Sequence, residues 1–261
     1  MDVKDWTVIV TGSSSGIGAA TVKLLAGQGA NVVINYSRSA AAAKAVAEAC
    51  EAAGAETLVV QADVASDADC RRLADAAFDR WGRLDGLVNN AGTTTFNAHD
   101  NLEGLQADDF QRIFAVNVVG GYQMIRACAD HMRASGGGSV VNISSIAAVM
   151  GVGSSVAYAA SKGAVNTMTL SLARALGPDI KVNALCPGFV QGEWLRQGMG
   201  EDAYNAQLKA LETRAPLRRA GTPEDMAEAA VMLLAGSRNI TGEVLICDAG
   251  MHLGMAAAKA R

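Results

Sequence analysis

Short β-branched stretches alternate with longer amphipathic, alanine-rich stretches along the whole chain, and this alternation restricts the fold more than any other feature of the sequence. Strands that alternate with helices form a parallel sheet covered by helices on both faces. The pattern therefore predicts an α/β fold with a doubly wound sheet. The expected strands are residues 7–10, 31–35, 57–61, 86–89, 139–143, 181–185 and 243–247, and the expected helices are residues 17–29, 40–53, 67–81, 108–134, 155–176 and 223–235.

No linker, repeat or low-complexity block interrupts this pattern, and half of the 261 residues are hydrophobic. A chain of this size and composition can bury one large core. We therefore expect a single domain over residues 1–261. The one long stretch without a strand, about residues 189–220, is expected to carry one or two mobile helices that form a lid over the substrate.

Charge and cysteine usage exclude several classes of function. The formal net charge is −4, so no overall positive field attracts nucleic acid or an anionic membrane. The five cysteines and three histidines are scattered, and none has the spacing of a metal site, which predicts reduced thiols, no metal and a cytoplasmic protein. The charged N-terminus leaves no room for a secretory signal, and no apolar stretch approaches the roughly 20 residues of a membrane span.

A glycine-rich segment, residues 11–18, joins the first expected strand to the first expected helix. Gly12 permits a sharp turn, Gly16 permits close approach of a pyrophosphate to the backbone, and Gly18 permits the helix to pack near the sheet. Free amides and the positive end of the helix dipole then meet the anion. The spacing G-x-x-x-G-x-G differs from the usual dinucleotide fingerprint, so the segment indicates phosphate binding mainly through its position after the first strand.

Tyr158 and Lys162 are four residues apart, which places a phenol and an ammonium on one face of the expected helix. A neighbouring cation favours the phenolate, so we expect Lys162 to lower the pKa of Tyr158 toward the range of a general acid/base. Ser145 lies thirteen residues before Tyr158, at the end of an apolar stretch. The sequence therefore offers a general acid/base at Tyr158.

Further short motifs complete an ordered set with these two: Asn89-Asn90-Ala91-Gly92, Asn117, Ser144-Ser145 and Pro187-Gly188. From about Trp6 to about Gly250 the set resembles the short-chain dehydrogenase/reductase family, and within it the 3-oxoacyl-[acyl-carrier-protein] reductase-like members. The resemblance implies a Rossmann-type, seven-stranded parallel sheet of order 3-2-1-4-5-6-7. It also implies a nicotinamide dinucleotide at the carboxyl ends of the strands and a homotetramer.

The same resemblance assigns the catalytic roles. It implies that Tyr158 is the acid/base, Lys162 binds the nicotinamide ribose, Ser145 hydrogen-bonds the substrate oxygen and Asn117 holds a water in a proton relay. By itself Asn117 could equally be a packed asparagine bonded to backbone. The implied cofactor contacts are Gly12, Ser14, Ser15, Gly16, Ile17, Gly18, Tyr36, Ser37, Arg38, Asp63, Val64, Asn90, Ala91, Gly92, Tyr158, Lys162, Pro187, Gly188 and Val190.

One of these assignments has an alternative, and one loop departs from the pattern of the family. Asp63, implied to face the adenine, could instead cap the following helix. The loop after Pro187 has Gly192 where many relatives of the family have a threonine, which predicts a weaker grip on the cofactor.

The end of the second expected strand favours NADP(H) over NAD(H). NAD enzymes usually carry an acidic residue there, which repels a 2′-phosphate. This chain has Tyr36, Ser37 and Arg38 instead, and Ser37 and Arg38 can donate to a phosphate. Against this, Ser15 stands where many NADP-linked relatives have a basic residue.

Residues 93–96, 146–152 and 191–194 are expected to line a pocket for a neutral, medium-sized ketone or secondary alcohol. An acyl carrier protein would dock on cations such as Arg126, Arg133 and Arg174, although these are equally typical of solvated surface charges. The leading interpretation is an NADP(H)-dependent oxidoreductase. The alternatives are an NAD-linked dehydrogenase of a sugar, steroid or small alcohol, and a non-catalytic redox sensor that binds the dinucleotide.

Overall fold

A computed structural model describes residues 3–254, so the outer ends of the expected 1–261 domain lie outside the described residues. Seven parallel strands form one sheet of order β3-β2-β1-β4-β5-β6-β7, which confirms the expected order. Each strand overlaps one expected from the sequence. The strands are β1 (Thr7–Val10), β2 (Asn31–Tyr36), β3 (Thr57–Gln61), β4 (Gly86–Asn89), β5 (Gly138–Ile143), β6 (Ile180–Pro187) and β7 (Val244–Cys247).

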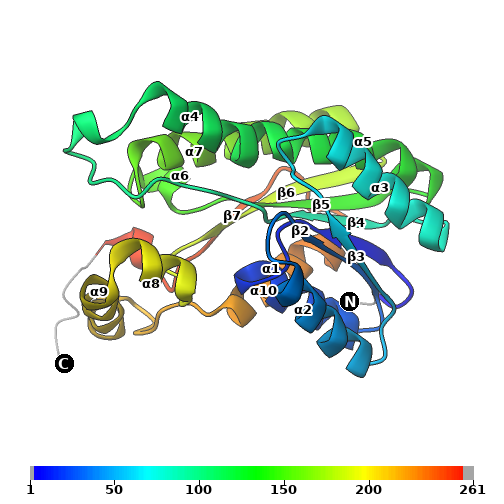
Figure 1. Ribbon diagram of the computed structural model, residues 1–261, viewed down its shortest axis with the longest axis horizontal. Helices are drawn as coiled ribbons and strands as arrows, with labels where there is room; N and C mark the ends of the chain where they lie inside the picture. Colours follow the sequence, from blue (N-terminus) through cyan, green and yellow to red (C-terminus); the bar gives the residue numbers. More distant parts are fainter. Residues whose placement is uncertain (1–2, 255–261) are drawn as a thin grey trace.

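Helices cover both faces of this sheet (Figure 1). One face carries α1 (Gly16–Gly27), α2 (Ala40–Ala52) and α10 (Pro223–Ala235), and the other carries α3 (Asp67–Trp81), α5 (Gly121–Ala134) and α7 (Val156–Leu176). The central strands are therefore shielded from water on both sides, which is why they are almost wholly apolar rather than alternating. None of the helices in residues 3–254 combines the length and apolarity that a membrane crossing needs.

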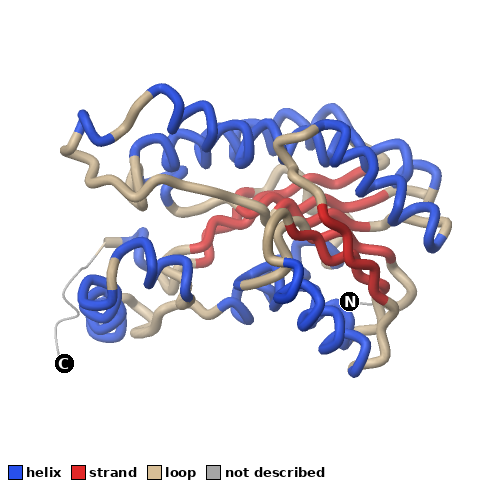
Figure 2. The backbone as a smooth tube through the Cα atoms, viewed as in Figure 1, coloured by secondary structure: helices blue, strands red, loops and turns tan. Residues whose placement is uncertain are grey.

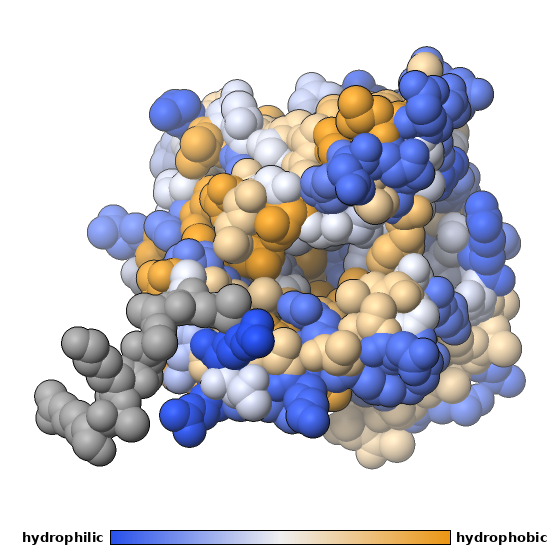
Figure 3. Space-filling model, turned by 90° about the vertical axis from the view of Figure 1, so that its left-hand side faces the viewer, coloured by the Kyte–Doolittle hydropathy of each residue, from blue (hydrophilic) through white to orange (hydrophobic). Residues whose placement is uncertain are grey.

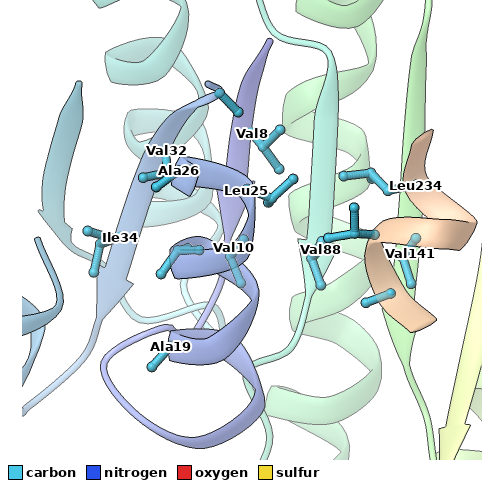
Figure 4. Packing of buried hydrophobic residues seen from close by; sticks show 14 of the residues in the cluster. Val8, Val10, Ala19, Leu25, Ala26, Val32, Ile34, Val88, Val141 and Leu234 are labelled. Atoms are coloured by element: carbon cyan, nitrogen blue, oxygen red, sulfur yellow. The ribbon is translucent and has the colours of Figure 1, made fainter. Parts of the chain in front are cut away.

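Two buried clusters of hydrophobic side chains lie on the two faces of the sheet. In the first, Leu25 of α1 and Leu234 of α10 pack on Val8, Val10 and Val88 of the central strands (Figure 4). All five side chains are fully buried. Burial of such side chains is worth about 1.5–3 kcal/mol each, so these clusters fix where the strand ends lie.

The helix expected over residues 108–134 is interrupted in the structure. It divides into α4 (Ala107–Phe114), a π-helical segment η2 (Ala115–Gly120) and α5, which follow one another without a break. A π-helical turn contains one extra residue, so it rotates the following helix and re-aims its own side chains. Asn117 lies inside η2. The expected helical stretch is therefore present, but it changes to π-helical geometry at the position of a site residue.

All seven strands end at one edge of the sheet, on the left of Figure 1, and loops gather there (Figure 2). The expected helical excursion over about residues 189–220 contains α8 (Glu193–Met199) and α9 (Glu201–Arg214). A parallel bridge between Val190 and Gly221 holds the two ends of this excursion together. The loops at this edge also contain α6 (Ala147–Met150) and the short 3₁₀ turns η1 (Leu102–Gly104) and η3 (Met251–Leu253).

Candidate active site

The glycine-rich turn lies between β1 and α1 as expected. Gly12 and Gly16 have φ of 62° and 55°, a left-handed conformation that favours glycine. A Cβ at Gly18 would lie 2.5 Å from Asn90 Nδ2, so only glycine fits where α1 starts beside the loop after β4. Around Gly16 a Cβ would meet no atom within 4 Å, so this part of the turn is open to a ligand.

Side-chain amides hold this turn in place, and the sequence reasoning missed two of their functions. Asn35 Oδ1 accepts a hydrogen bond from the Gly12 N–H at 3.0 Å, while its amide group donates to the Val60 carbonyl in β3 and the Ala62 carbonyl after it. Asn90 donates to the Thr11 and Gly12 carbonyls at 2.9 and 3.1 Å. Asn90 was expected to contact the cofactor, but its amide N–H groups donate to the turn instead. An asparagine at the buried end of a strand was the available signal for Asn35.

The residues of the turn fit a pyrophosphate. No side chain caps the start of α1 in the described structure, and Ser15 and Gly16 are exposed there. The first-turn N–H groups of a helix have no partner within it, and the helix dipole favours an anion at this end. The group that the turn fits is one with closely spaced negative oxygens.

Tyr36 ends β2, and Ser37 and Arg38 are exposed directly after it, with no carboxylate in this stretch. Asp63 is also exposed, at the end of the neighbouring β3. The alternative that Asp63 caps the next helix is wrong, because Ser66 caps α3 by accepting from the Asp69 N–H. Asp63 instead accepts from the Ala65 N–H at 3.0 Å.

Tyr158, Lys162 and Ser145 come together at the carboxyl edge. Ser155 caps α7 by accepting from the Tyr158 N–H, which fixes the phenol in the first turn of that helix. Lys162, one turn later, is buried and places its ammonium 5.6 Å from the centre of the Tyr158 ring. Ser145, after β5, shares a hydrogen bond with Tyr158. Ser144 instead is buried and donates to the Lys162 carbonyl.

The pKa values in this cluster correct the sequence argument. Burial raises the pKa of Tyr158 to about 12, and the hydrogen bond with Ser145 offsets only part of that rise. Burial also lowers the pKa of Lys162 to about 8. The expected lowering of the Tyr158 pKa by Lys162 is therefore not found in the chain itself. The physical reason is that Lys162 is itself desolvated and directs its ammonium to the Ile143 carbonyl, at 2.7 Å.

Asn117 clamps a neighbouring loop. Its Oδ1 accepts from the Thr93 N–H at 2.8 Å, and its Nδ2 donates to the Thr93 carbonyl and to Ser161 Oγ, both at 3.0 Å. Ser161 in turn donates to the Tyr158 carbonyl. The side chain thus connects η2, the loop after β4 and the helix of Tyr158. The relay role implied for Asn117 stays a prediction.

A small cavity lies beside these groups, with about 10 Å³ of room for the centre of a water molecule. Asn117, Lys162 and Asn89 are among its lining residues. Asn89 Oδ1 is buried and has no hydrogen-bond partner within residues 3–254. A space of this size is at the lower limit for one water, and such a water needs polar partners. The site therefore has room for one water next to the Lys162 ammonium.

The loop after β6 forms another wall of the site. The Ile146 N–H donates to the Pro187 carbonyl, and Gly188 packs on Asp248 after β7. The Val190–Gly221 bridge uses the Phe189 carbonyl and the Gln191 N–H, so the peptide groups of Val190 itself point away from Gly221. The contact of Val190 with a cofactor stays a prediction.

Other expectations from the sequence are partly met. Arg126 is paired with Asp67, and Arg133 with Asp130 and Asp179, so neither cation presents an unpaired charge to a carrier protein. All five cysteines are free thiols. Within the described chain, no group of three or more His, Cys, Asp or Glu residues could hold a metal ion.

Comparison with known proteins identifies the family. Residues 12–252 match a family model described as enoyl-(acyl carrier protein) reductase. A crystal structure of a putative short-chain dehydrogenase/reductase from Burkholderia xenovorans aligns with a TM-score of 0.88 at 43% identity, over 96% of this chain and 99% of that one. The chain belongs to the short-chain dehydrogenase/reductase family. Members of this family are NAD(P)-dependent oxidoreductases that act on keto and alcohol groups.

Relatives within the short-chain dehydrogenase/reductase family have names that span several substrates. The putative ketoacyl reductase 2 of the granaticin polyketide synthase of Streptomyces violaceoruber is 42% identical, over 94% of this chain and 95% of that protein. An L-rhamnose 1-dehydrogenase (NAD(P)(+)) of a Sphingomonas species is 34% identical, over 95% of this chain and 97% of that protein. The chain matches both along nearly its whole length, so overall similarity does not choose between their substrates.

The burial of Tyr158 gives a direct spectroscopic prediction. In the protein without cofactor, the Tyr158 phenol should ionise near pH 12, about two units above an ordinary tyrosine. A rapid pH jump, followed through the tyrosinate absorbance before the protein unfolds, should show this component in the wild type. Tyr158→Phe should lack it and keep the components of the other three tyrosines. If the component that Tyr158→Phe removes titrates at or below pH 10, the raised pKa is contradicted.

Proposed function

We propose that this chain is an NADP(H)-dependent oxidoreductase that transfers a hydride between the nicotinamide and a ketone or secondary alcohol, with Tyr158 as acid/base. The strongest support is that Tyr158, Ser145 and Lys162 come together at the carboxyl edge of the sheet. The glycine-rich turn, which is open around Gly16 and fits a pyrophosphate, lies at the same edge. The bound dinucleotide supplies or accepts the hydride. The side chains of the protein handle the oxygen and the proton.

Each of the three side chains has a distinct task in this mechanism. As hydride reaches the carbonyl carbon, negative charge develops on the oxygen, and the Ser145 hydroxyl donates a hydrogen bond to it. The Tyr158 phenol then gives the oxygen its proton. The Lys162 ammonium, 5.6 Å from the ring, is a cation next to the phenolate that remains, but in the chain itself burial outweighs its effect on the Tyr158 pKa. Because the pKa of Tyr158 is about 12, the phenol is protonated at neutral pH and ready for reduction.

Removal of the phenolic oxygen tests the mechanism. Tyr158→Phe should lower kcat for ketone reduction by about 10²- to 10⁴-fold, the usual contribution of a general acid, because the alkoxide loses its proton source. Binding of NADPH, followed by quenching of protein fluorescence, and the melting temperature should change little. Undiminished turnover in Tyr158→Phe would refute the mechanism. A wild type that binds NADPH but reduces no ketone in a broad panel would favour the redox-sensor alternative.

The preference for NADP(H) is part of the same proposal. Arg38 and Ser37 are exposed after β2, and no carboxylate stands there to repel a 2′-phosphate. The Gln61 amide donates to the Ser37 carbonyl at 3.1 Å, which holds this corner next to the end of β3. An exposed guanidinium at this corner supports the proposal, because Arg38 can give a charged hydrogen bond to the phosphate.

Neutralisation of Arg38 tests this preference. A hydrogen bond to a charged group contributes about 1.5–3 kcal/mol, so Arg38→Ala should raise KM for NADPH about 10- to 100-fold and leave KM for NADH nearly unchanged. Lys44→Ala is the matched control, since Lys44 is an exposed cation on the adjacent α2. A tenfold preference of the wild type for NADH in kcat/KM, or equal effects of the two substitutions, would contradict the assignment.

We also propose that residues 1–261 form one domain with a lid at about residues 189–220, and that the protein is a cytoplasmic homotetramer. The single sheet and the two helices of the excursion support the domain and its lid. Five free thiols fit a reducing compartment. Apolar side chains on α4, α5, α6, α7 and η2 are exposed and fit a contact between subunits: Phe110, Val119, Tyr122, Val149, Met150, Val156 and Leu170.

The small residues of α7 contribute to this face only in part. Ala160 is exposed, but Ala157 is fully buried and packs inside the subunit. Val156, next to Ala160 on α7, lines a shallow depression of about 340 Å³. A charge buried in an apolar contact is costly, so Val156→Glu should shift the sedimentation coefficient from tetramer to smaller species. Met232→Glu on α10, equally exposed, should not. A wild type that sediments as a monomer would refute the assembly.

A further inference from the structure

Two aromatic side chains form a row with the Tyr158 ring. Trp194, at the start of α8, has its ring centre 6.1 Å from that of Tyr158. Phe96, in the loop after β4, also contacts Trp194, with ring centres 5.7 Å apart and an interplanar angle of 61°. This is an edge-to-face pair within the preferred range for aromatic contacts. We call Phe96 and Trp194 the aromatic pair.

The orientation of the aromatic pair is fixed by the backbone. Gly198 lies four residues after Trp194 and therefore on the same face of α8. A Cβ at Gly198 would overlap the Phe96 ring, so the helix rests flat against that ring. Despite its two aromatic neighbours, Trp194 remains 49% exposed. About half of this residue is thus left uncovered, although its ring centre lies within 6.1 Å of that of the acid/base.

The surface around this corner is hollowed, with hydrophobic side chains on part of its rim (Figure 3). The charged side chains of α8, and two on α4 that hydrogen-bond to Thr95, are already paired. On α8, Arg196 pairs with Glu193 and Glu201 and lies over the Tyr204 ring. In the loop of Phe96, the neighbouring Thr95 hydroxyl donates to Asp109, which also pairs with Arg112.

This arrangement favours one chemical class of substrate. A carboxylate or phosphate on the substrate would need a cation that these ion pairs already occupy, and a polyhydroxylated substrate would lose hydrogen bonds with water against two apolar rings. A flat ring beside the carbonyl, by contrast, can stack on the open part of Trp194 while its oxygen reaches Tyr158 and Ser145.

We propose that the aromatic pair selects ketones that carry an aromatic ring next to the carbonyl, and the corresponding 1-aryl alcohols. The inference rests on the proposed function, because it places the carbonyl oxygen at Tyr158. Trp194 provides the stacking surface, and Phe96 holds Trp194 in position through their edge-to-face contact.

Steady-state kinetics with two ketones of similar size test the selection. With NADPH, the wild type should show a KM for acetophenone about tenfold below that for cyclohexyl methyl ketone, since aromatic stacking contributes up to that factor. Trp194→Ala should raise KM for acetophenone about tenfold and leave KM for cyclohexyl methyl ketone within about threefold. Trp194→Phe, which keeps a ring, should retain most of the preference.

Gln197→Ala is the matched control, because Gln197 is exposed on the same short helix and is not part of the aromatic pair. It should leave both KM values unchanged, while a general weakening of the lid would alter them for both ketones. Equal KM values in the wild type, or equal effects of Trp194→Ala on the two ketones, would overturn the inference.

A binding measurement without turnover separates this inference from the proposed function. Acetophenone should quench protein fluorescence saturably in the wild type, and the saturable part should be absent in Trp194→Phe, in which Trp6 and Trp81 remain. Saturable quenching without reduction of any ketone would refute the proposed function and leave the binding preference standing. Reduction without saturable quenching would refute the aromatic selection alone.

Discussion

The site depends on one constraint: buried backbone groups must be hydrogen-bonded even where the sheet ends. In a parallel sheet every strand stops at the same edge, so the loops there lose their ladder partners. Asparagine side chains replace them, because an amide offers both a donor and an acceptor. Asn35 and Asn90 hold the glycine-rich turn, and Asn117 holds the loop at Thr93. Asn183 has a similar function at the opposite edge, where β7 begins, donating to the Ile240 carbonyl and accepting from the Glu243 N–H. The loops that carry the chemistry are therefore as well fixed as the strands behind them.

Burial sets the acid/base behaviour of the site as much as charge does. The same low-polarity surroundings raise the pKa of Tyr158 and lower that of Lys162, so both side chains are biased toward their neutral forms. A neutral phenol is the form that can give up a proton. Lys162 keeps its positive charge below about pH 8, and this charge lies next to the phenolate that remains after proton transfer. The pair is thus suited to proton donation, and oxidation of an alcohol should become easier as pH rises, because it needs the phenol deprotonated.

Much of this could be predicted from the sequence, and the failures have physical causes. Seven strands were evident because buried β-branched stretches are unlike anything else in the chain, and their order followed from the resemblance of the motifs. The π-helical segment was missed because one extra residue in a turn does not change the apolar character around Asn117. The raised pKa of Tyr158 was missed because sequence spacing reports which charges are near but not how much water is excluded. Two further features were missed because each connects residues far apart in the chain, and no local pattern encodes such a contact. These are the hydrogen bond from the Gly12 N–H to Asn35 and the contact of Phe96 with Trp194.

The bridge between Val190 and Gly221 has a consequence for how such a protein changes over time. It closes the base of the excursion that carries Trp194, so residues 191–220 leave the sheet and return to it at one fixed point. Insertions, deletions or substitutions beyond that point reshape the cover of the pocket without disturbing the strands, the turn or the acid/base. Substrate choice can then change without a change of the fold. A lineage can acquire new substrates by rewriting one surface segment while the hydride-transfer apparatus stays as it is.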